Sequence, residues 1–445
     1  MVSGEEPKKP RLSPHQRGAR CFFENQRSIM GKLVGNKNVG LLRSVEERAQ
    51  HKKEEDEQKK QQVPYFHRDS LSNILLRLPL GSLHHARFVC KPWYNLINSP
   101  FFIDTHLRRS ESVLVFLKPV PRQGSYNYSS TPITTEQPNT FSVEGSFLQS
   151  LPVPIFDQPK TNRESTYYVQ FIEFGEGKSK IGEYKMSCRG NIRATCNGLI
   201  LLDNKLKKGG LIVMNPVTRK IAAQPLGTLF PPERESYGFA VNDVNGEYKV
   251  VHLFQDNSGY VSCETLVLGN RSWRAVDGPS LGLFGWLGYP PISAIGGLHW
   301  IPQVDRSDYL VSMEVHGEKF HTIQLPKSCR VHDKIIEMGG SLCFVFHEGL
   351  NIDIWSLKCL SGDAWKKQYS ITRGCIIDMV PLLSLRVSGD LIFKRNEDGS
   401  FYAYDVKLQE MRKIESHNGH FLRAGPYLPH VNSLVSWTRS EGICD

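Results

Sequence analysis

The sequence predicts a multidomain protein in which a small all-α unit is followed by a large all-β domain. Apolar residues recur at helical spacing within residues 63–108, and short strands alternate with Gly, Asn and Pro turns over residues 109–445. A charged segment with few apolar residues, 1–62, precedes both. At 445 residues the chain exceeds what one hydrophobic core usually organises, so more than one folded unit is expected.

The composition is that of a globular protein, with 40% hydrophobic and 22% charged residues. No apolar run reaches the length of a membrane span, and residues 1–10 carry two Glu and two Lys where a secretory signal would be apolar. We therefore expect no membrane partner and a location in the nucleus, the cytoplasm or both. The ten cysteines show no CxxC pairing, so we expect reduced thiols and no metal site.

Residues 1–62 are predicted to form a disordered basic tail. They contain 14 Lys+Arg against 9 Asp+Glu, an excess of 5 that is half of the chain's formal +10. Their few apolar residues cannot offset the entropy of ordering the chain. Within the tail, Lys8, Lys9 and Arg11 resemble a short nuclear import signal. A solvated tail without any targeting signal explains the same residues equally well, and nucleic acid is not an expected partner.

The all-α unit is predicted to contain three short helices. Their boundaries follow from capping residues and prolines: Asp69 or Ser70 to Pro79, a second helix capped by Ser82, and a third from Pro92 to Ser99-Pro100. A unit of this size buries too little surface to be stable alone, so we expect it to need a partner. Periodicity by itself also permits a helical cap packed on the downstream domain.

The residues of this unit resemble an F-box. Three blocks occur in order at the family's spacing: Ile74-Leu75-Leu76-Arg77-Leu78-Pro79, Val89-Cys90-Lys91-Pro92-Trp93 and Leu96-Ile97-Asn98-Ser99-Pro100. The resemblance implies that the unit packs an apolar face against a Skp-type adaptor, which bridges to a cullin and a RING protein. It also implies nine adaptor-facing residues: Ile74, Leu75, Leu78, Pro79, Val89, Cys90, Trp93, Leu96 and Ile97.

The start of the F-box departs from the family's pattern. Phe66-His67 occupy the places where family members usually have Leu-Pro. Loss of one rim contact costs about 1 kcal/mol, whereas buried Trp and Leu anchors dominate helix-in-groove interfaces. We therefore expect adaptor binding to be weakened or retained, not abolished.

The all-β domain contains a repeated strand that begins with glycine. The strand follows Gly198, Gly297, Gly340 and Gly389, with spacings of 43 and 49 residues between the last three and a hairpin at Asn245-Gly246 in the longer gap. This period is that of a four-stranded β-propeller blade of the kelch size class, although the Gly-Gly pairs can also be simple turns. The Asn-Gly pair predicts a tight primed hairpin turn, and large aromatic residues are expected to fill the wedges between blades.

The all-β domain also resembles the F-box-associated domains of plants. Eight blocks occur in the family's order, among them Thr195–Ile200, Val213–Lys220 and Phe320–Pro326, and Val431–Ser436 is similar to the family's closing strand. With the F-box, the resemblance covers most of the chain. It implies an interaction platform for a protein client and leaves the identity of that client open.

These features favour the substrate-recognition subunit of an SCF-type (Skp-cullin-F-box) ubiquitin ligase, which holds the adaptor on its helices and a protein client on its β-domain. No Walker loop, GxSxG, HExxH or strand-following GxGxxG occurs, so we expect no enzyme activity and no cofactor. The receptor would contribute proximity. The alternative is a ubiquitin-independent nuclear scaffold, with a degenerate F-box and a basic tail that binds nucleic acid or acidic partners.

Overall fold

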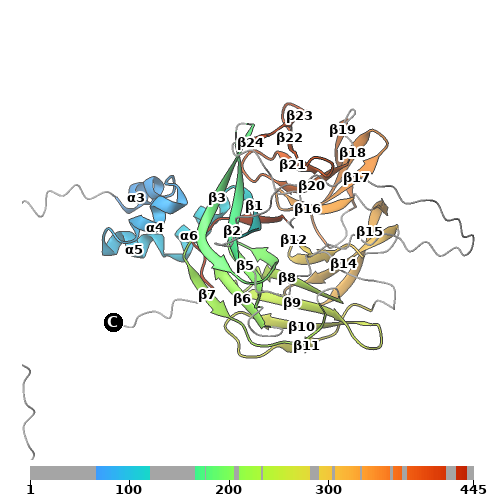
Figure 1. Cartoon of the computed structure of the whole chain (residues 1–445), viewed down its shortest axis with the longest axis horizontal. Helices are drawn as coiled ribbons and strands as arrows, with labels where there is room; N and C mark the ends of the chain where they lie inside the picture. The colour runs from blue at the N-terminus through green and yellow to red at the C-terminus, as the bar shows by residue number, and fades with distance from the viewer. Residues whose placement is uncertain are drawn as a thin grey trace, which may run out of the picture. The chain divides into compact units, whose positions relative to one another are not determined.

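The computed structural model describes residues 67–120 and 166–437, except for 176, 205–209, 232–233, 281–289, 303–305, 331–332, 361–363, 373–377 and 417–426 (Figure 1). The predicted tail with Lys8, Lys9 and Arg11 lies outside these residues, as does Phe66. The chain divides into two units, 1–71 and 72–445, and the first is described only from His67. None of the described helices is long and apolar enough to cross a membrane.

The predicted helical unit is confirmed, and it contains a fourth helix. The helices are α3 (Arg68–Leu75), α4 (Leu80–Ala86), α5 (Lys91–Ile97) and α6 (Pro100–Arg109). Helix α6 is absent from the sequence-based prediction because Ser99-Pro100 also has the signature of a helix end. In the structure the Ser99 hydroxyl accepts a hydrogen bond from the Phe102 N–H at 3.3 Å, and Pro100 lies in the first turn, where its missing N–H costs nothing.

Two predicted helix starts are wrong by a few residues. Helix α3 already begins at Arg68, so Asp69 and Ser70 lie inside its first turn. Helix α4 begins after Pro79, which places Ser82 within the helix instead of at its cap. In both cases the chain enters the helix before the polar residue that the sequence favours as a cap, which is the usual error of boundary prediction.

The β-domain is a six-bladed propeller (Figure 1). Five blades are four-stranded antiparallel sheets whose strands follow chain order. Their strands are β4 (Ile192–Cys196), β5 (Leu199–Asn204), β6 (Gly210–Asn215), β7 (Lys220–Ala223); β8 (Glu235–Val241), β9 (Tyr248–Gln255), β10 (Val261–Val267), β11 (Arg274–Val276); β12 (Ile292–Ala294), β13 (Gly297–Trp300), β14 (Ser307–Glu314), β15 (Phe320–Cys329); β16 (Lys334–Met338), β17 (Ser341–Glu348), β18 (Asn351–Leu357), β19 (Lys366–Thr372); β20 (Met379–Ser384), β21 (Leu391–Arg395), β22 (Phe401–Asp405) and β23 (Glu410–Lys413).

The sixth blade combines strands from both ends of the domain. Its order is β24-β3-β2-β1-β25, made of β1 (Ser112–Pro119), β2 (Tyr167–Gly175), β3 (Lys178–Cys188), β24 (Glu415–Ser416) and β25 (Leu428–Val431). Strand β25 pairs antiparallel with β1, so that Ser112 lies opposite Val431 and Val115 opposite Leu428. The closing strand thus ends at Val431, and the expectation that residues 431–436 form it is wrong.

The first strands of the five regular blades and β25 form the inner ring of the propeller. Strand β4 contacts β8, β12 contacts β8 and β16, and β16 contacts β20. Strand β25 contacts both β20 and β4, which closes the ring. In a closed ring every inner strand has a neighbour on both sides. The ring of this domain therefore closes only when β25 has paired with β1.

The glycine-led repeat is confirmed as the second strand of each regular blade. Gly198, Gly297, Gly340 and Gly389 precede or begin β5, β13, β17 and β21, and Asn245-Gly246 precedes β9. The glycines are also turn residues, since φ is 91° at Gly198 and 80° at Gly340. The propeller expectation is therefore correct, while its kelch subtype stays a prediction.

The hairpin turn at Asn245-Gly246 differs from the prediction. A type I′ turn needs positive φ at both central residues, but Gly246 has φ 71° and Asn245 does not lie in that region. Instead the Asn242 N–H donates to the Glu247 carbonyl and the Gly246 N–H donates to the Asn242 carbonyl, each at 2.8 Å. The strands are joined by residues 242–247, so the predicted tight turn is wrong although the hairpin itself is present.

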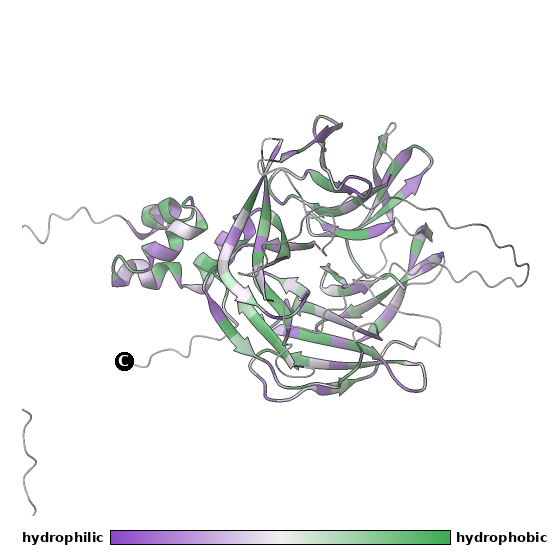
Figure 2. Ribbon diagram, in the orientation of Figure 1, coloured by the Kyte–Doolittle hydropathy of each residue, from purple (hydrophilic) through white to green (hydrophobic). Residues whose placement is uncertain are grey.

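The hydrophobic core lies between neighbouring blades. Figure 2 shows apolar segments along the strands of the blades. Trp300 is 1% exposed and packs with residues of its own blade and of the β8–β11 blade, and its Nε1 donates to Ser236 Oγ of that blade at 3.1 Å. The expectation that large aromatics fill the wedges is confirmed at this position. Leu107 of α6 packs in another such cluster, with β-domain residues that include Leu199.

Candidate functional site

The nine residues predicted to face an adaptor differ in exposure. Ile74, Pro79, Val89 and Cys90 are exposed, Leu78 and Trp93 are half-buried, and Leu75, Leu96 and Ile97 are buried. The buried three hold the short helices together, because a unit of this size has few other apolar side chains to bury. The surface that a partner can contact without rearrangement therefore consists of the other six.

Three aromatic residues of the same helical unit are also exposed. Phe88 and Phe101 are each 76% exposed, and Tyr94 is 52% exposed. Phe88 lies in the turn after α4, where helical periodicity does not apply, so sequence analysis missed it. The detectable signal was the pair of adjacent apolar residues Phe88-Val89 directly before the Lys91-Pro92 helix start.

The turn Phe88-Val89-Cys90 is a continuous exposed apolar segment. Val89 is 63% exposed, and Cys90 is an exposed free thiol. The imidazole of His84 lies 5.9 Å from the ring of Phe88, centroid to centroid. Partial burial, then the charges of Arg87 and His85, lower the pKa of His84, so this neighbour is uncharged at neutral pH. Covering a large apolar side chain gains about 1.5–3 kcal/mol, which makes the turn a favourable docking surface.

The propeller offers a second candidate surface. Because the strands of each blade are antiparallel, the loops between second and third strands and the crossovers to the next blade emerge on the same face. We call this the crossover face. It carries four large apolar side chains that are at least 55% exposed: Leu226, Leu229, Tyr260 and Leu350. Exposed apolar residues on one face are a common feature of protein interaction surfaces.

The first part of the crossover between β7 and β8, residues 224–231, is held firmly against the next blade. Trp273 Nε1 donates to the Pro225 carbonyl at 3.0 Å, and the backbone N–H and hydroxyl of Thr228 donate to Glu264, each at 2.9 Å. The ring of Phe230 stacks on that of Phe254 with centroids 4.8 Å apart. Leu226 and Leu229 are therefore presented by an anchored segment, which lowers the entropy that binding must overcome.

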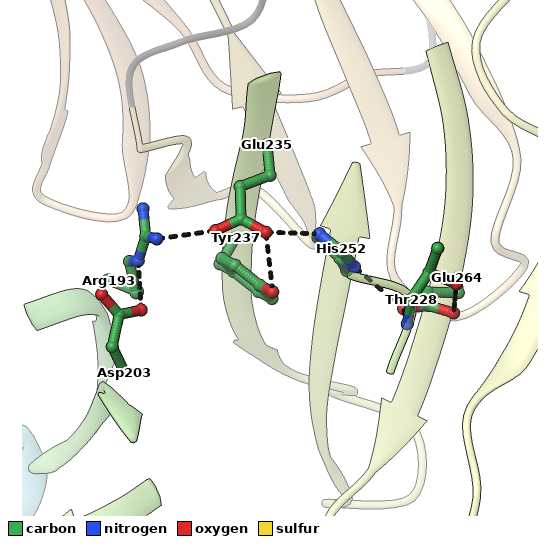
Figure 3. Close-up of polar contacts among 7 residues, drawn as sticks. All are labelled: Arg193, Asp203, Thr228, Glu235, Tyr237, His252 and Glu264. Atoms are coloured by element: carbon green, nitrogen blue, oxygen red, sulfur yellow. Dashed lines mark hydrogen bonds and ion pairs between the residues drawn. The ribbon is translucent and has the colours of Figure 1, made fainter. Parts of the chain in front are cut away.

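A chain of buried charges joins the β4–β7 blade to the β8–β11 blade (Figure 3). Arg193 on β4 contacts Asp203 on β5 at 2.5 Å and Glu235 on β8 at 2.6 Å. Glu235 also accepts a hydrogen bond from the Tyr237 hydroxyl at 3.1 Å. The Arg193 side chain is 17% exposed and that of Glu235 only 8%. Each charge has therefore lost most of its contact with water and is stabilised by its partner instead.

The chain continues through His252 on β9. Its Nε2 lies 3.2 Å from Glu235 and its Nδ1 2.9 Å from Glu264 on β10, while its ring stacks on Tyr237 at 4.3 Å. Burial alone would lower the pKa of His252, but hydrogen bonds to the two carboxylates raise it above its ordinary value. His252 therefore keeps its proton to a higher pH than an ordinary histidine does. Its side chain is 0% exposed, so no ligand can reach it and it acts as a clamp between strands.

Among the described residues, no group of three or more His, Cys, Asp or Glu side chains could hold a metal ion. Six of the described cysteines are free thiols, namely Cys90, Cys188, Cys196, Cys263, Cys329 and Cys343.

Comparisons with known proteins agree with this architecture. The F-box domain model matches residues 66–105, and the F-box associated beta propeller domain model matches residues 156–425. Three Arabidopsis thaliana relatives are F-box protein CPR1, 23% identical over 344 residues (68% of this chain, 72% of the relative), putative F-box protein At3g10240, 24% over 401 residues (83% and 92%), and F-box protein At5g10340, 26% over 333 residues (67% of each). Since the propeller model alone matches more than half of the chain, this protein belongs to the F-box proteins with an F-box-associated β-propeller domain.

Proposed function

We propose that this protein is a substrate-recognition subunit of an SCF-type ubiquitin ligase. In this role the F-box helices bind a Skp-type adaptor, which links to a cullin and a RING protein, and the propeller binds a protein client. The subunit itself makes no bond. It raises the effective concentration of the client near the conjugating enzyme, and such proximity can replace a large part of an activation barrier.

The exposed apolar turn Phe88-Val89-Cys90 is the observation that carries this proposal. A small helical unit with Phe88 76% and Val89 63% exposed leaves a large apolar area in water, although its own core residues Leu75 and Ile97 are fully buried. The unit is thus folded and still has apolar surface left to cover. An adaptor groove that receives short amphipathic helices supplies that cover.

The propeller contributes a rigid support for the client. Its six blades close into a ring, and the β7–β8 crossover with Leu226 and Leu229 is anchored by Glu264 and Trp273. Loops on a rigid scaffold can differ in sequence without loss of the fold, which suits a receptor whose client differs among relatives.

The test is co-purification of the full chain with a Skp-type adaptor. Phe88→Ser combined with Val89→Ser removes exposed apolar surface only, so the fold is retained. If each side chain contributes about 1–2 kcal/mol, affinity falls by about 30-fold to 1,000-fold. The matched control is Val387→Ser with Leu408→Ser, two propeller residues that are 70% and 63% exposed, and it should bind as the wild type does.

Absence of the adaptor from the wild-type complex would refute the proposal. Equal adaptor binding by the Phe88/Val89 variant and the control would show that this turn is not the docking surface. Trp93→Ala and Leu78→Ala, at half-buried positions of the same unit, extend the test, with thermal unfolding to show that each variant is folded.

A further inference from the structure

A pocket of about 310 Å³ opens on the crossover face, between the β12–β15 and β16–β19 blades. Its lining is Arg306, Lys327, Ser328, Arg330, Phe346 and Glu348. Three cations against one carboxylate give this lining a formal charge of +2 (3 − 1). Asp308 lies outside the lining, where it accepts a hydrogen bond from Ser328 at 2.5 Å, and including it still leaves +1.

The cations of the pocket are positioned by an aromatic floor. Phe346 on β17 is 3% exposed, and the Lys327 ammonium and Arg330 guanidinium lie 5.7 Å and 5.5 Å from the centre of its ring. These are cation–π distances. Two long side chains that are already held on one ring lose less conformational entropy when a ligand arrives.

A buried carboxylate fixes the backbone beneath Arg330. Asp333, whose side chain is 0% exposed, accepts a hydrogen bond from the Arg330 N–H at 2.7 Å and another from the His347 N–H at 2.9 Å. Arg330 and Asp333 are thereby tied to β17, the strand that carries Phe346. The two sides of the pocket thus keep a fixed spacing.

The positive charges of the pocket are available to a ligand. Within the part of the chain that the structure describes, neither Arg306 nor Arg330 has a carboxylate within ion-pair distance. Lys327 pairs with Glu348 at 3.1 Å, but the two side chains are 41% and 53% exposed, so the pair contributes little and can exchange. Leu350, 66% exposed, follows Glu348 in the same turn and adds an apolar contact beside the charges.

We infer that this pocket binds an acidic segment of the protein client, with carboxylates on Arg306, Lys327 and Arg330 and a following apolar side chain on Leu350. The inference rests on the proposed function, since it names the chemistry of the client. Guanidinium groups match carboxylates in a planar, bidentate geometry.

The probe for this inference is a fluorescein-labelled peptide with four aspartates followed by two leucines, titrated with the full chain by fluorescence anisotropy. We expect saturable binding that weakens with added salt, because the site is exposed to solvent. Replacing the aspartates by asparagines should abolish binding. Replacing the leucines by alanines should weaken binding to the wild type more than binding to the Leu350→Ala variant.

Variants of the pocket show whether the peptide binds there. Lys327→Ala or Arg330→Ala should each weaken binding about threefold, and the double variant at least about tenfold. The control is Arg271→Ala with Lys407→Ala, two exposed cations in β10–β11 and β22–β23 turns, which removes the same charge from the chain and should leave affinity unchanged.

Equal affinity of the pocket variant and the control would overturn the inference, and so would binding of a phosphoserine peptide in place of the aspartate peptide. Adaptor co-purification is measured on the same preparations. If the adaptor co-purifies but the pocket variants bind the peptide as the control does, only the inference about the pocket is refuted. If the peptide binds as expected but the adaptor does not co-purify, the proposed ligase function is refuted.

Discussion

Two fully buried histidines should give this propeller opposite responses to pH. His252 lies between Glu235 and Glu264 and has a raised pKa, whereas His299 on β13 has a pKa that burial lowers to about 4. His299 is neutral and contacts Ser312 Oγ at 2.7 Å and the Ala294 carbonyl at 2.9 Å. The perturbation is His252→Ala compared with His299→Ala, which are matched because both side chains are 0% exposed and both lie on second strands of adjacent blades.

The magnitude for His299 follows from its pKa. A group whose folded pKa is below the ordinary 6.5 stabilises the fold fully above pH 6.5, and this contribution is lost as pH falls towards 4. The total shift corresponds to about 3 kcal/mol, of which about 2 kcal/mol is lost between pH 7 and pH 5. The stability difference between wild type and His299→Ala should therefore shrink by about 2 kcal/mol over that interval.

For His252 the sign is reversed. Its raised pKa means that the imidazolium stabilises the fold fully below pH 6.5, and the contribution is lost as pH rises through the folded value. Below pH 6.5, His252→Ala should lower the free energy of unfolding by about 3–5 kcal/mol, because it leaves two buried carboxylates without their shared cation. Above pH 6.5 this loss of stability should become smaller, by up to about 1.4 kcal/mol per pH unit.

The assay is urea unfolding followed by tryptophan fluorescence at intervals from pH 5 to pH 9, with each variant compared with the wild type at the same pH. Because the variants share every other titrating group, the differences isolate the two histidines. A cost for His252→Ala that grows with pH, or equal slopes for both variants, would show that the charge states assigned to these side chains are wrong.

Three further predictions concern single residues. The exposed thiol of Cys90 should react with iodoacetamide in the folded protein, while Cys343, whose pKa burial raises to about 12, should react only after unfolding, as mass spectrometry of labelled peptides would show. Asn215→Ala should lower the free energy of unfolding by about 2–4 kcal/mol, because the buried amide donates to the Ser433 and Val435 carbonyls at 3.1 and 2.8 Å. The same variant should be cleaved faster by a protease after β25, and unchanged cleavage would contradict this role. Trp300→Ala should cost about 3–5 kcal/mol in urea unfolding, since it empties the wedge between two blades.

Local patterns in the sequence were sufficient to predict the repeated blades. The turn before the second strand of a blade contains a glycine in four blades: Gly198, Gly297, Gly340 and Gly389. The spacing of these glycines therefore predicts the length of a blade. The sixth blade has no such signal, because β25 and β1 come from opposite ends of the domain and pair over more than 300 residues of sequence. Helix α6 was hidden because Ser99-Pro100 ends one helix and begins the next.

The candidate sites were less accessible to sequence reasoning. Spacing placed Ile74, Val89 and Trp93 in the helical unit, but it could not separate them from Leu75, which the folded unit buries. The basic pocket depends on side chains from β15, from β17 and from the segments that precede β14 and β16, which meet only after the blades have packed. Arg330 gains its position from Phe346 and Asp333, neither of which is marked by its neighbours in the sequence. Tertiary contacts of this kind leave no local pattern to read.

The closure of the ring by β25 has a consequence for synthesis. A ribosome makes β1 hundreds of residues before β25, so while the five regular blades emerge and fold, β1 keeps an unpaired edge and the inner ring stays open between β20 and β4. Exposed strand edges favour association with other chains, and domains of this size are vulnerable during that interval. A nascent chain that terminates before Leu428 can form every regular blade and still present an open edge, so premature stop codons late in the coding sequence should yield aggregation-prone products that quality control removes.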